Sequence, residues 1–205
     1  MKRGLFNIWQ VLIIVGHIPN SMEFKYEFIM EDERIFSDCN DKPPGVLDIT
    51  DLFDFTNTTF RMTESGVTLS GCKTVIWGIE PSDRVEIALS GLYFDRGTWQ
   101  PTTLNVLIRD FCTVMFDPKQ AWYDSYSKHI KNAAEVNHTC FRVKGSQIIF
   151  ETYTIQPVFA SGMTIKSGRY AMRFMHSAYD ENEVVRQNKI CYEIKGEIQK
   201  SSQSK

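Results

Sequence analysis

Residues 110–145 read DFCTVMFDPKQAWYDSYSKHIKNAAEVNHTCFRVKG and form the only stretch of this 205-residue chain with a helical pattern. Apolar residues recur in it at the spacing of one helix face, namely Trp122, Tyr126, Ile130 and Ala133. The pattern predicts one short amphipathic helix, between Cys112 and Cys140, that lies against a sheet. A disulfide between these cysteines would pin both ends of the helical segment and contribute about 3.5 kcal/mol in the chain-entropy model. The alternative is a core helix with reduced cysteines.

Outside this stretch the chain reads as strands in which apolar and polar residues alternate. The predicted strands cover residues 24–30, 60–62, 67–79, 85–94, 103–108, 147–158, 168–176 and 190–198. Turn residues separate most of them, as at Ser65-Gly66 and Ser167-Gly168. The last strand is expected to pack Ile190, Tyr192, Ile194 and Ile198 and to expose Glu193, Lys195 and Glu197. The sequence therefore predicts a mainly β, antiparallel fold.

Residues 1–21 have the pattern of a secretory signal peptide. Lys2 and Arg3 form a basic start, and the apolar run that follows is shorter than the roughly 20 residues of a membrane span. We therefore expect a secreted, extracellular protein with a single domain at residues 22–199 and a polar tail at residues 200–205.

The charge of the expected mature chain argues against a nucleic-acid partner. Without Lys2 and Arg3, the 23 basic residues fall to 21 against 25 acidic ones, a net charge of −4. Binding to a polyanion needs a basic stripe, and the basic residues here are scattered.

The cysteine pattern indicates a disulfide framework. All five cysteines follow the predicted signal peptide: Cys39, Cys72, Cys112, Cys140 and Cys191. An odd number leaves one unpaired, and their spacing does not decide which ones pair. Two sequons, at Asn57 and Asn137, fit a secretory route and predict glycosylation at surface positions.

Motifs of metal binding and catalysis are missing. Five aspartates lie close together in the sequence, at Asp38, Asp41, Asp48, Asp51 and Asp54, but they lack the spacing, glycine and final glutamate of a calcium loop. The chain has no nucleophile elbow, zinc-protease helix, Cys-x-x-Cys or phosphate loop. His129, His138 and His176 have no recognisable nucleophile beside them. We expect a protein that is not an enzyme and needs no metal or cofactor.

Residues 168–176 suggest a binding function, because both faces of this strand are largely apolar. Tyr170, Met172 and Phe174 alternate there with Ala171, Arg173 and Met175. One explanation is that a helix or second sheet covers the outer face. The other is an apolar cavity in which soft Met and aromatic side chains adapt to a greasy ligand. Large apolar residues expected in loops or near the predicted helix would form the rim of such a cavity: Trp99, Trp122, Phe159 and Met163.

Five short segments carry a resemblance to a known family. They are Phe36-Ser-Asp-Cys39-Asn, Arg109-Asp-Phe-Cys112, His138-Thr-Cys140-Phe with Gly145, Lys166-Ser-Gly-Arg-Tyr170 and Lys189-Ile-Cys191. In this order the chain resembles the insect chemosensory protein B (CheB) family, which is similar to the lysosomal ganglioside activator protein. The resemblance spans about residues 36–198.

The resemblance implies a cup or sandwich of about eight antiparallel strands with an apolar cavity, its mouth formed by loops and a short helix. It implies no catalytic residues. It also implies the pairs Cys39–Cys191 and Cys112–Cys140, which leaves Cys72 free. The further bridges of the activator are absent, since no other cysteine lies between Cys112 and Cys140.

The implied function is that of a secreted chemosensory protein that binds or presents an apolar ligand, such as a lipid or cuticular pheromone. Its expected lipid-binding residues are Trp99, Trp122, Phe159, Met163, Tyr170, Met172 and Phe174. The expected partners are an apolar small molecule or lipid, a chemosensory receptor or channel, and a membrane in transient contact. Two alternatives are a glycolipid-extracting activator of a hydrolase and a coreceptor module that carries nothing.

Overall fold

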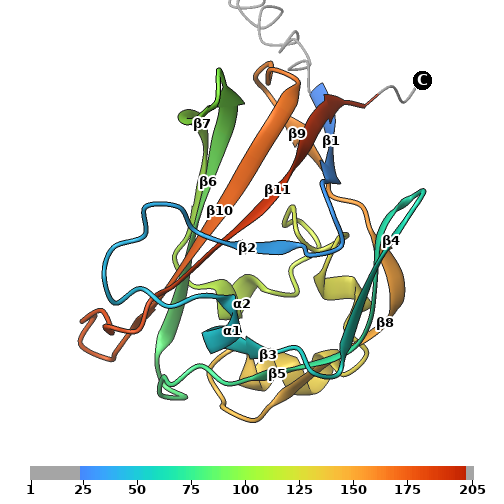
Figure 1. The fold of residues 1–205 in the computed structure, drawn as a ribbon. Coiled ribbons are helices and arrows are strands. Elements are labelled where there is room, and N and C mark those ends of the chain that lie inside the picture. Colours follow the sequence, from blue (N-terminus) through green and yellow to red (C-terminus); the bar gives the residue numbers. More distant parts are fainter. Residues whose placement is uncertain (1–23, 202–205) are drawn as a thin grey trace, which may run out of the picture.

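The computed structural model describes residues 24–201, and it confirms the mainly β, antiparallel fold (Figure 1). The predicted signal peptide, residues 1–21, lies outside the described residues, as do residues 202–205 of the predicted tail. Lys200 was assigned to that tail but belongs to the last strand, and the backbone N–H of Ser201 still donates to the carbonyl of Lys25 at 2.8 Å.

The larger sheet has seven strands and forms one wall of the interior. Its members are β1 (Phe24–Met30), β2 (Phe36–Asp38), β6 (Arg84–Asp95), β7 (Thr98–Ile108), β9 (Val158–Ser161), β10 (Gly168–Tyr179) and β11 (Ile190–Lys200). The order is β7-β6-β10-β11-β1-β9. β11 pairs with β10 along one edge, and its other edge is shared by β1 and β2.

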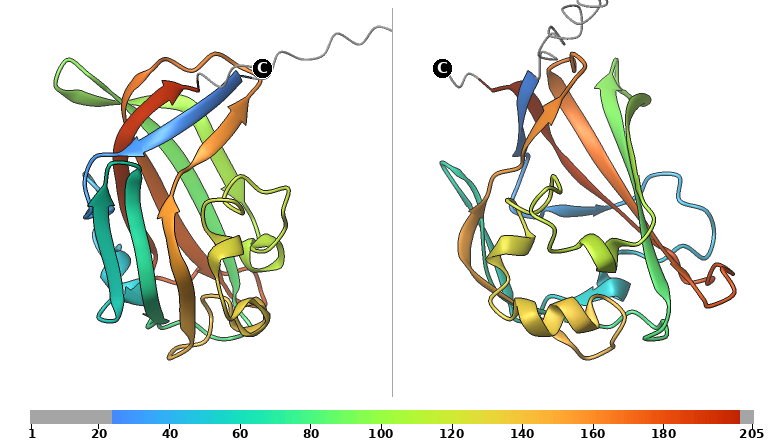
Figure 2. Two further views of the ribbon diagram at one scale, coloured as in Figure 1. Left: turned by 90° about the vertical axis from the view of Figure 1, so that its right-hand side faces the viewer. Right: turned by 180° about the vertical axis from the view of Figure 1, so that it is seen from behind.

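The smaller sheet has four strands and forms the opposite wall. They are β3 (Phe53–Asp54), β4 (Thr58–Thr63), β5 (Gly66–Val75) and β8 (Gln147–Ile155). β3 and β4 share one edge of β5, and β8 occupies the other. β8 leads directly into β9, so the chain passes from one sheet to the other and links the two walls (Figure 2).

Three of the predicted strands differ most from the observed ones. The strand expected at residues 67–79 ends at Val75, and the one expected at 147–158 is two strands, β8 and β9. The strand expected from Thr103 begins at Thr98, which puts Trp99 in β7 rather than in a turn.

A bulge in β8 changes which of its residues face the interior. Leu69 of β5 pairs with Tyr153, whereas Gly71, two residues on, pairs with Phe150, so β8 has one extra residue between them. Before the bulge Ile148 and Phe150 are buried, and after it Tyr153 is buried. Both segments of β8 therefore supply aromatic side chains to the interior.

The helical segments are shorter than the sequence pattern predicts. They are α1 (Ile49–Leu52), α2 (Phe111–Val114), η3 (Ser127–His129) and α3 (Ala133–Thr139), and they gather at one end of the sheets (Figures 1 and 2). The expected continuous helix through Trp122 and Ile130 does not form. The backbone of Tyr126 is not helical, and Ile130 is extended, with φ −82° and ψ 114°, where it forms an isolated antiparallel bridge with Phe150 of β8.

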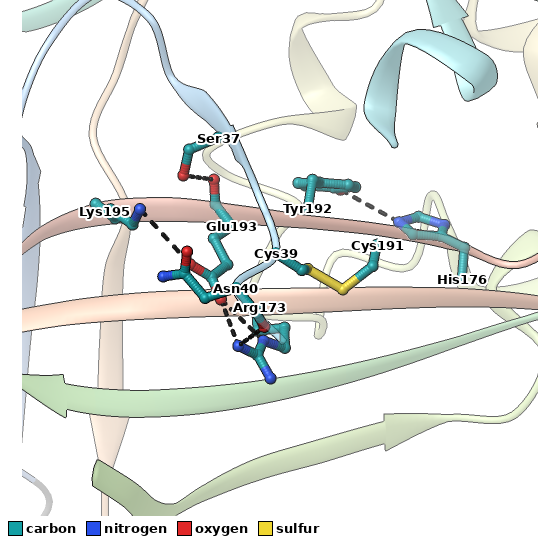
Figure 3. Close-up of a disulfide and its surroundings, with 9 residues drawn as sticks. All are labelled: Ser37, Cys39, Asn40, Arg173, His176, Cys191, Tyr192, Glu193 and Lys195. Carbon is teal, nitrogen blue, oxygen red and sulfur yellow. Dashed lines mark hydrogen bonds and ion pairs between the residues drawn. A yellow bond between two sulfur atoms is a disulfide. The ribbon is translucent and has the colours of Figure 1, made fainter. Parts of the chain in front are cut away.

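Two disulfides have the pairing implied by the resemblance. Cys39 bonds to Cys191 with a Cα–Cα distance of 5.8 Å, and Cys112 bonds to Cys140 with a distance of 5.6 Å. Cys72 is free. The first bridge fastens the segment after β2 to the outer face of β11 (Figure 3), and the second ties α2 to the end of α3.

The outer faces of β10 and β11 are covered beside the first disulfide (Figure 3). Glu193 was expected on a wet face, but its side chain is fully buried there. Arg173 donates to its Oε1 atom from Nε at 2.9 Å and from Nη2 at 2.7 Å, and also to the backbone carbonyl of Asn40 at 2.8 Å. The chain following β2 thus covers this pair, which explains why both faces of β10 are largely shielded.

Candidate functional site

A cavity of about 590 Å³ lies between the two sheets. Both sheets and the segment between α2 and η3 supply its walls. Its volume is within the range of about 300–1,000 Å³ typical of small-molecule sites. Most of its lining side chains are aliphatic or aromatic, so the cavity suits an apolar guest.

Aromatic rings stacked across strands form much of the wall. Phe174 of β10 stacks on Tyr192 of β11 with centroids 5.0 Å apart, and the Phe36 ring meets Tyr192 edge to face at 5.3 Å. On the opposite wall Phe53 meets Phe141 at 5.0 Å. Aromatic pairs of this kind stabilise the packing and also give the cavity a firm apolar surface.

Apolar side chains at the opening of the cavity are exposed. Met163 after β9, Val158 in β9 and Val106 in β7 all line the cavity, yet they are 61%, 47% and 50% exposed. Leu107, the neighbour of Val106, is 56% exposed. Met163, Val158 and Val106 form an apolar rim at the opening, whereas Leu107 is not among the residues that line the cavity.

Five of the seven predicted binding residues line this cavity. They are Trp122, Phe159, Met163, Met172 and Phe174. They come from distant parts of the sequence, and the curled larger sheet with the α2–η3 segment brings them together.

Tyr170 and Trp99 lie outside the cavity wall, contrary to the prediction. Tyr170 is buried in a separate cluster with Tyr26 and Ile198, where its hydroxyl donates to the Lys166 carbonyl at 2.8 Å. Residues of β1 fill this end of the interior, so the tyrosine contacts protein instead of the cavity. Trp99 packs on the neighbouring ring of Phe94, with centroids 4.9 Å apart, because it belongs to a strand.

Sequence reasoning missed Lys73, the one charged side chain among the lining residues. It is only 7% exposed, and its Nζ atom lies 3.7 Å from the centroid of Phe53 and 4.9 Å from that of Tyr126. Burial lowers the pKa of this amine from 10.5 to about 7. The signal was present in the sequence, since Lys73 shares the inward alternation of β5 with Val67 and Val75.

His176 is the second polar side chain buried at this end of the cavity. Its Nε2 atom lies 3.2 Å from the Tyr192 hydroxyl, and its Nδ1 atom has no hydrogen-bond partner (Figure 3). Burial, together with the charge of nearby Lys73, lowers the pKa of His176 to about 3, so the ring is neutral at physiological pH.

The other two histidines considered in the sequence analysis, His129 and His138, do not line the cavity. His129 stacks on Tyr153 at 3.7 Å, its Nδ1 atom lies 2.6 Å from Glu151, and its Nε2 atom lies 3.0 Å from the Asp124 carbonyl. His138 is exposed in α3. These two side chains therefore lie outside the polar end of the cavity.

The remaining candidate sites lie on the surface. Asn57 and Asn137, the two sequon asparagines, are both exposed. Asp48 caps α1 by accepting from the Thr50 N–H at 2.8 Å. Within residues 24–201, no three metal-ligating side chains come together, and no helix is long and apolar enough to cross a membrane.

The fold and the site define a disulfide-linked, two-sheet β cup with an internal apolar cavity. Beyond this class, the chain matches no family model, and no curated protein matches its sequence.

Proposed function

We propose that this chain is a secreted chemosensory protein that binds an apolar ligand, a lipid or a cuticular pheromone, and carries or presents it. The observation that carries the proposal is the largely apolar cavity of about 590 Å³ between the sheets. An apolar ligand gains about 25 cal/mol for each Å² of its surface that leaves water, so one buried alkyl chain can bind without charged contacts. The protein acts by binding and has no catalytic step of its own.

An extracellular location is supported by the covalent framework. The chain has two disulfides, and disulfides persist mainly in oxidising compartments. Both sequon asparagines are exposed and therefore accessible for glycosylation. The chemosensory role itself rests on the resemblance to the CheB family. A receptor or channel in a sensory cell would be the partner to which the loaded protein presents its ligand.

The apolar rim favours a second candidate function, that of a glycolipid-extracting activator of a hydrolase. Met163, Val158 and Val106 are exposed at the opening, and exposed apolar patches often mark a membrane or partner contact. Both candidates use the cavity, but only the activator needs the rim to insert into a bilayer. A coreceptor module that carries nothing needs neither feature.

Native mass spectrometry of the secreted protein tests the proposal directly. We expect copurified lipid, and after delipidation we expect saturable binding of a neutral dye such as Nile red that long-chain esters displace. A protein that copurifies with no lipid and binds neither the dye nor any of several lipid classes would leave the coreceptor module as the better account. Insertion into lipid monolayers, lost on Met163→Ser, would favour the activator.

A further inference from the structure

Lys73 is a buried cation for which the protein supplies no anion. Its side chain is among the buried polar groups, and no ion pair or hydrogen bond joins its Nζ atom to another described residue. Buried charges in proteins are normally paired, because desolvation without a partner is costly. Four aromatic rings surround the amine, those of Phe53, Tyr126, Phe141 and Phe150. An aromatic ring is a weaker hydrogen-bond acceptor than a carboxylate, so the rings do not replace an anion.

A second hydrogen-bond donor without a partner lies beside it. The hydroxyl of Tyr126 is buried and has no hydrogen-bond partner. Its ring centroid is 4.9 Å from the Lys73 Nζ atom, and both residues line the cavity. The two come from different elements, since Lys73 belongs to β5 and Tyr126 directly precedes η3.

The pair His176 and Tyr192 supplies a third unused donor in either tautomer. If the Tyr192 hydroxyl donates to Nε2 of His176, the histidine carries its proton on Nδ1, which has no partner. If Nε2 carries the proton and donates to Tyr192, the tyrosine O–H is free to donate elsewhere. Both residues line the cavity, and both are buried.

The closed end of the cavity therefore has three donors and lacks an acidic acceptor. No Asp or Glu occurs among the described residues that line the cavity. A carboxylate offers two oxygens and about four lone-pair sites, and it forms its strongest hydrogen bonds with charged donors. This set of groups is what an anionic head group requires.

The larger sheet sets the direction in which a ligand would lie. His176, Phe174 and Met172 line the cavity in succession along β10, and at about 3.3 Å per residue they span roughly 13 Å. The loop that precedes β10 carries Met163, which lies at the rim. A head group beside Lys73 and His176 would thus place an alkyl tail along apolar side chains toward the opening.

We propose that the cavity binds a long-chain carboxylate with its head inward, held by Lys73 together with the Tyr126 hydroxyl and the His176–Tyr192 pair. The inference rests on the proposed carrier function and adds the ligand's chemical class and orientation. The carboxylate forms an ion pair with the protonated amine, which removes the cost of an unpaired buried charge.

The test compares three ligands of equal chain length on delipidated, disulfide-intact protein: palmitic acid, methyl palmitate and hexadecanol. Displacement of Nile red at pH 7 reports each affinity. We expect the acid to bind at least about tenfold more tightly than the ester or the alcohol, since a hydrogen-bonded ion pair is lost with the neutral heads. Lys73→Met should abolish this preference, so that the acid binds no more tightly than the ester or the alcohol. Lys144→Met, at an exposed lysine, is the matched control and should change nothing.

The outcomes separate this inference from the proposed function. Equal binding of acid, ester and alcohol by the unmodified protein would overturn the role of Lys73 while the carrier function stands, and this comparison needs no variant to fold. A tenfold acid preference that survives in Lys73→Met would overturn it as well. If none of the three ligands nor the dye binds, the carrier function and the inference both fail.

Discussion

The Nζ atom of Lys73 lies 3.7 Å from the centroid of the Phe53 ring, on the inward face of β5. β3 carries Phe53 and pairs with β5 at Val75, so the geometry of two paired strands holds the ring over the amine. The ring stabilises the protonated amine, while burial favours the neutral form and brings the pKa to about 7. This opposition makes the amine responsive both to pH and to a bound anion.

The first prediction is that the ligand-free protein becomes more stable as the pH rises from about 7 to 9. Above a pKa of about 7 the folded protein loses the Lys73 proton, whereas the unfolded chain keeps it up to 10.5. The unfolded state then binds more protons, so the free energy of unfolding increases, by at most about 1.4 kcal/mol per pH unit. Urea denaturation at pH 7, 8 and 9 measures the slope.

The control for the pH slope is a pair of lysine variants. Lys73→Met should flatten the slope over this range, and the exposed Lys144→Met should keep it. An identical slope in the unmodified protein and in Lys73→Met would show that Lys73 titrates normally in the fold.

The second prediction is that Met172→Trp fills the cavity and blocks dye binding. Met172 lines the cavity and is only half-buried, so the larger ring can occupy empty space and should change stability little. In a filled core the same change would cost about 1–3 kcal/mol. Nile red binding and urea denaturation separate the two cases. Met62→Trp, at an exposed position on β4, should leave dye binding intact.

The third prediction concerns the relative weight of the two disulfides. Cys39–Cys191 closes a loop with a sequence separation of 152, against 28 for Cys112–Cys140. In the chain-entropy model their contributions are about 5 and about 3.5 kcal/mol, so replacing the first pair by alanine should hinder folding more. Denaturation of the two double variants measures this. Non-reducing peptide mapping should find Cys72 unlinked, and a Cys72 bridge within the monomer would contradict the framework.

The fourth prediction is that Arg173→Met destabilises the fold strongly, by about 3–5 kcal/mol, because it leaves the buried Glu193 carboxylate without its main partner. Lys195 lies 3.7 Å from the other carboxylate oxygen and compensates only in part. Replacing Glu193 by Gln in the same chain should recover a measurable part of the loss in thermal denaturation. Additive losses in the double variant would show that the two side chains do not interact.

The fifth prediction is that the purified protein does not hydrolyse glycolipids or esters. Among the histidines, His176 is the best candidate for a general base, because it is buried in the cavity wall. Its pKa of about 3 is far below neutral pH, so it is a poor general base there. Product formation followed by chromatography is the measurement. Turnover that persists through further purification and disappears in His176→Gln would contradict the proposal.

Local alternation in the sequence was enough to predict most of the strands. In β1, Tyr26 and Phe28 are buried and Lys25 is exposed, as the pattern indicates. The strand period is a property of the backbone, so it can be read without knowledge of what the strand contacts. The cavity residues Met172 and Phe174 were found for the same reason, because both lie on the apolar inward face of β10.

The sequence by itself thus determined the mainly β class, the alternating faces of the strands and the presence of enough cysteines for two bridges. Only the tertiary structure decided that Glu193 is buried and that Trp99 lies away from the cavity. It also decided that Lys73, Tyr126 and His176 line the same end of the cavity. The physical reason is that burial and partner choice depend on segments distant in sequence. The chain after β2 covers Glu193, and the curl of one sheet toward the other creates the cavity that Lys73 faces.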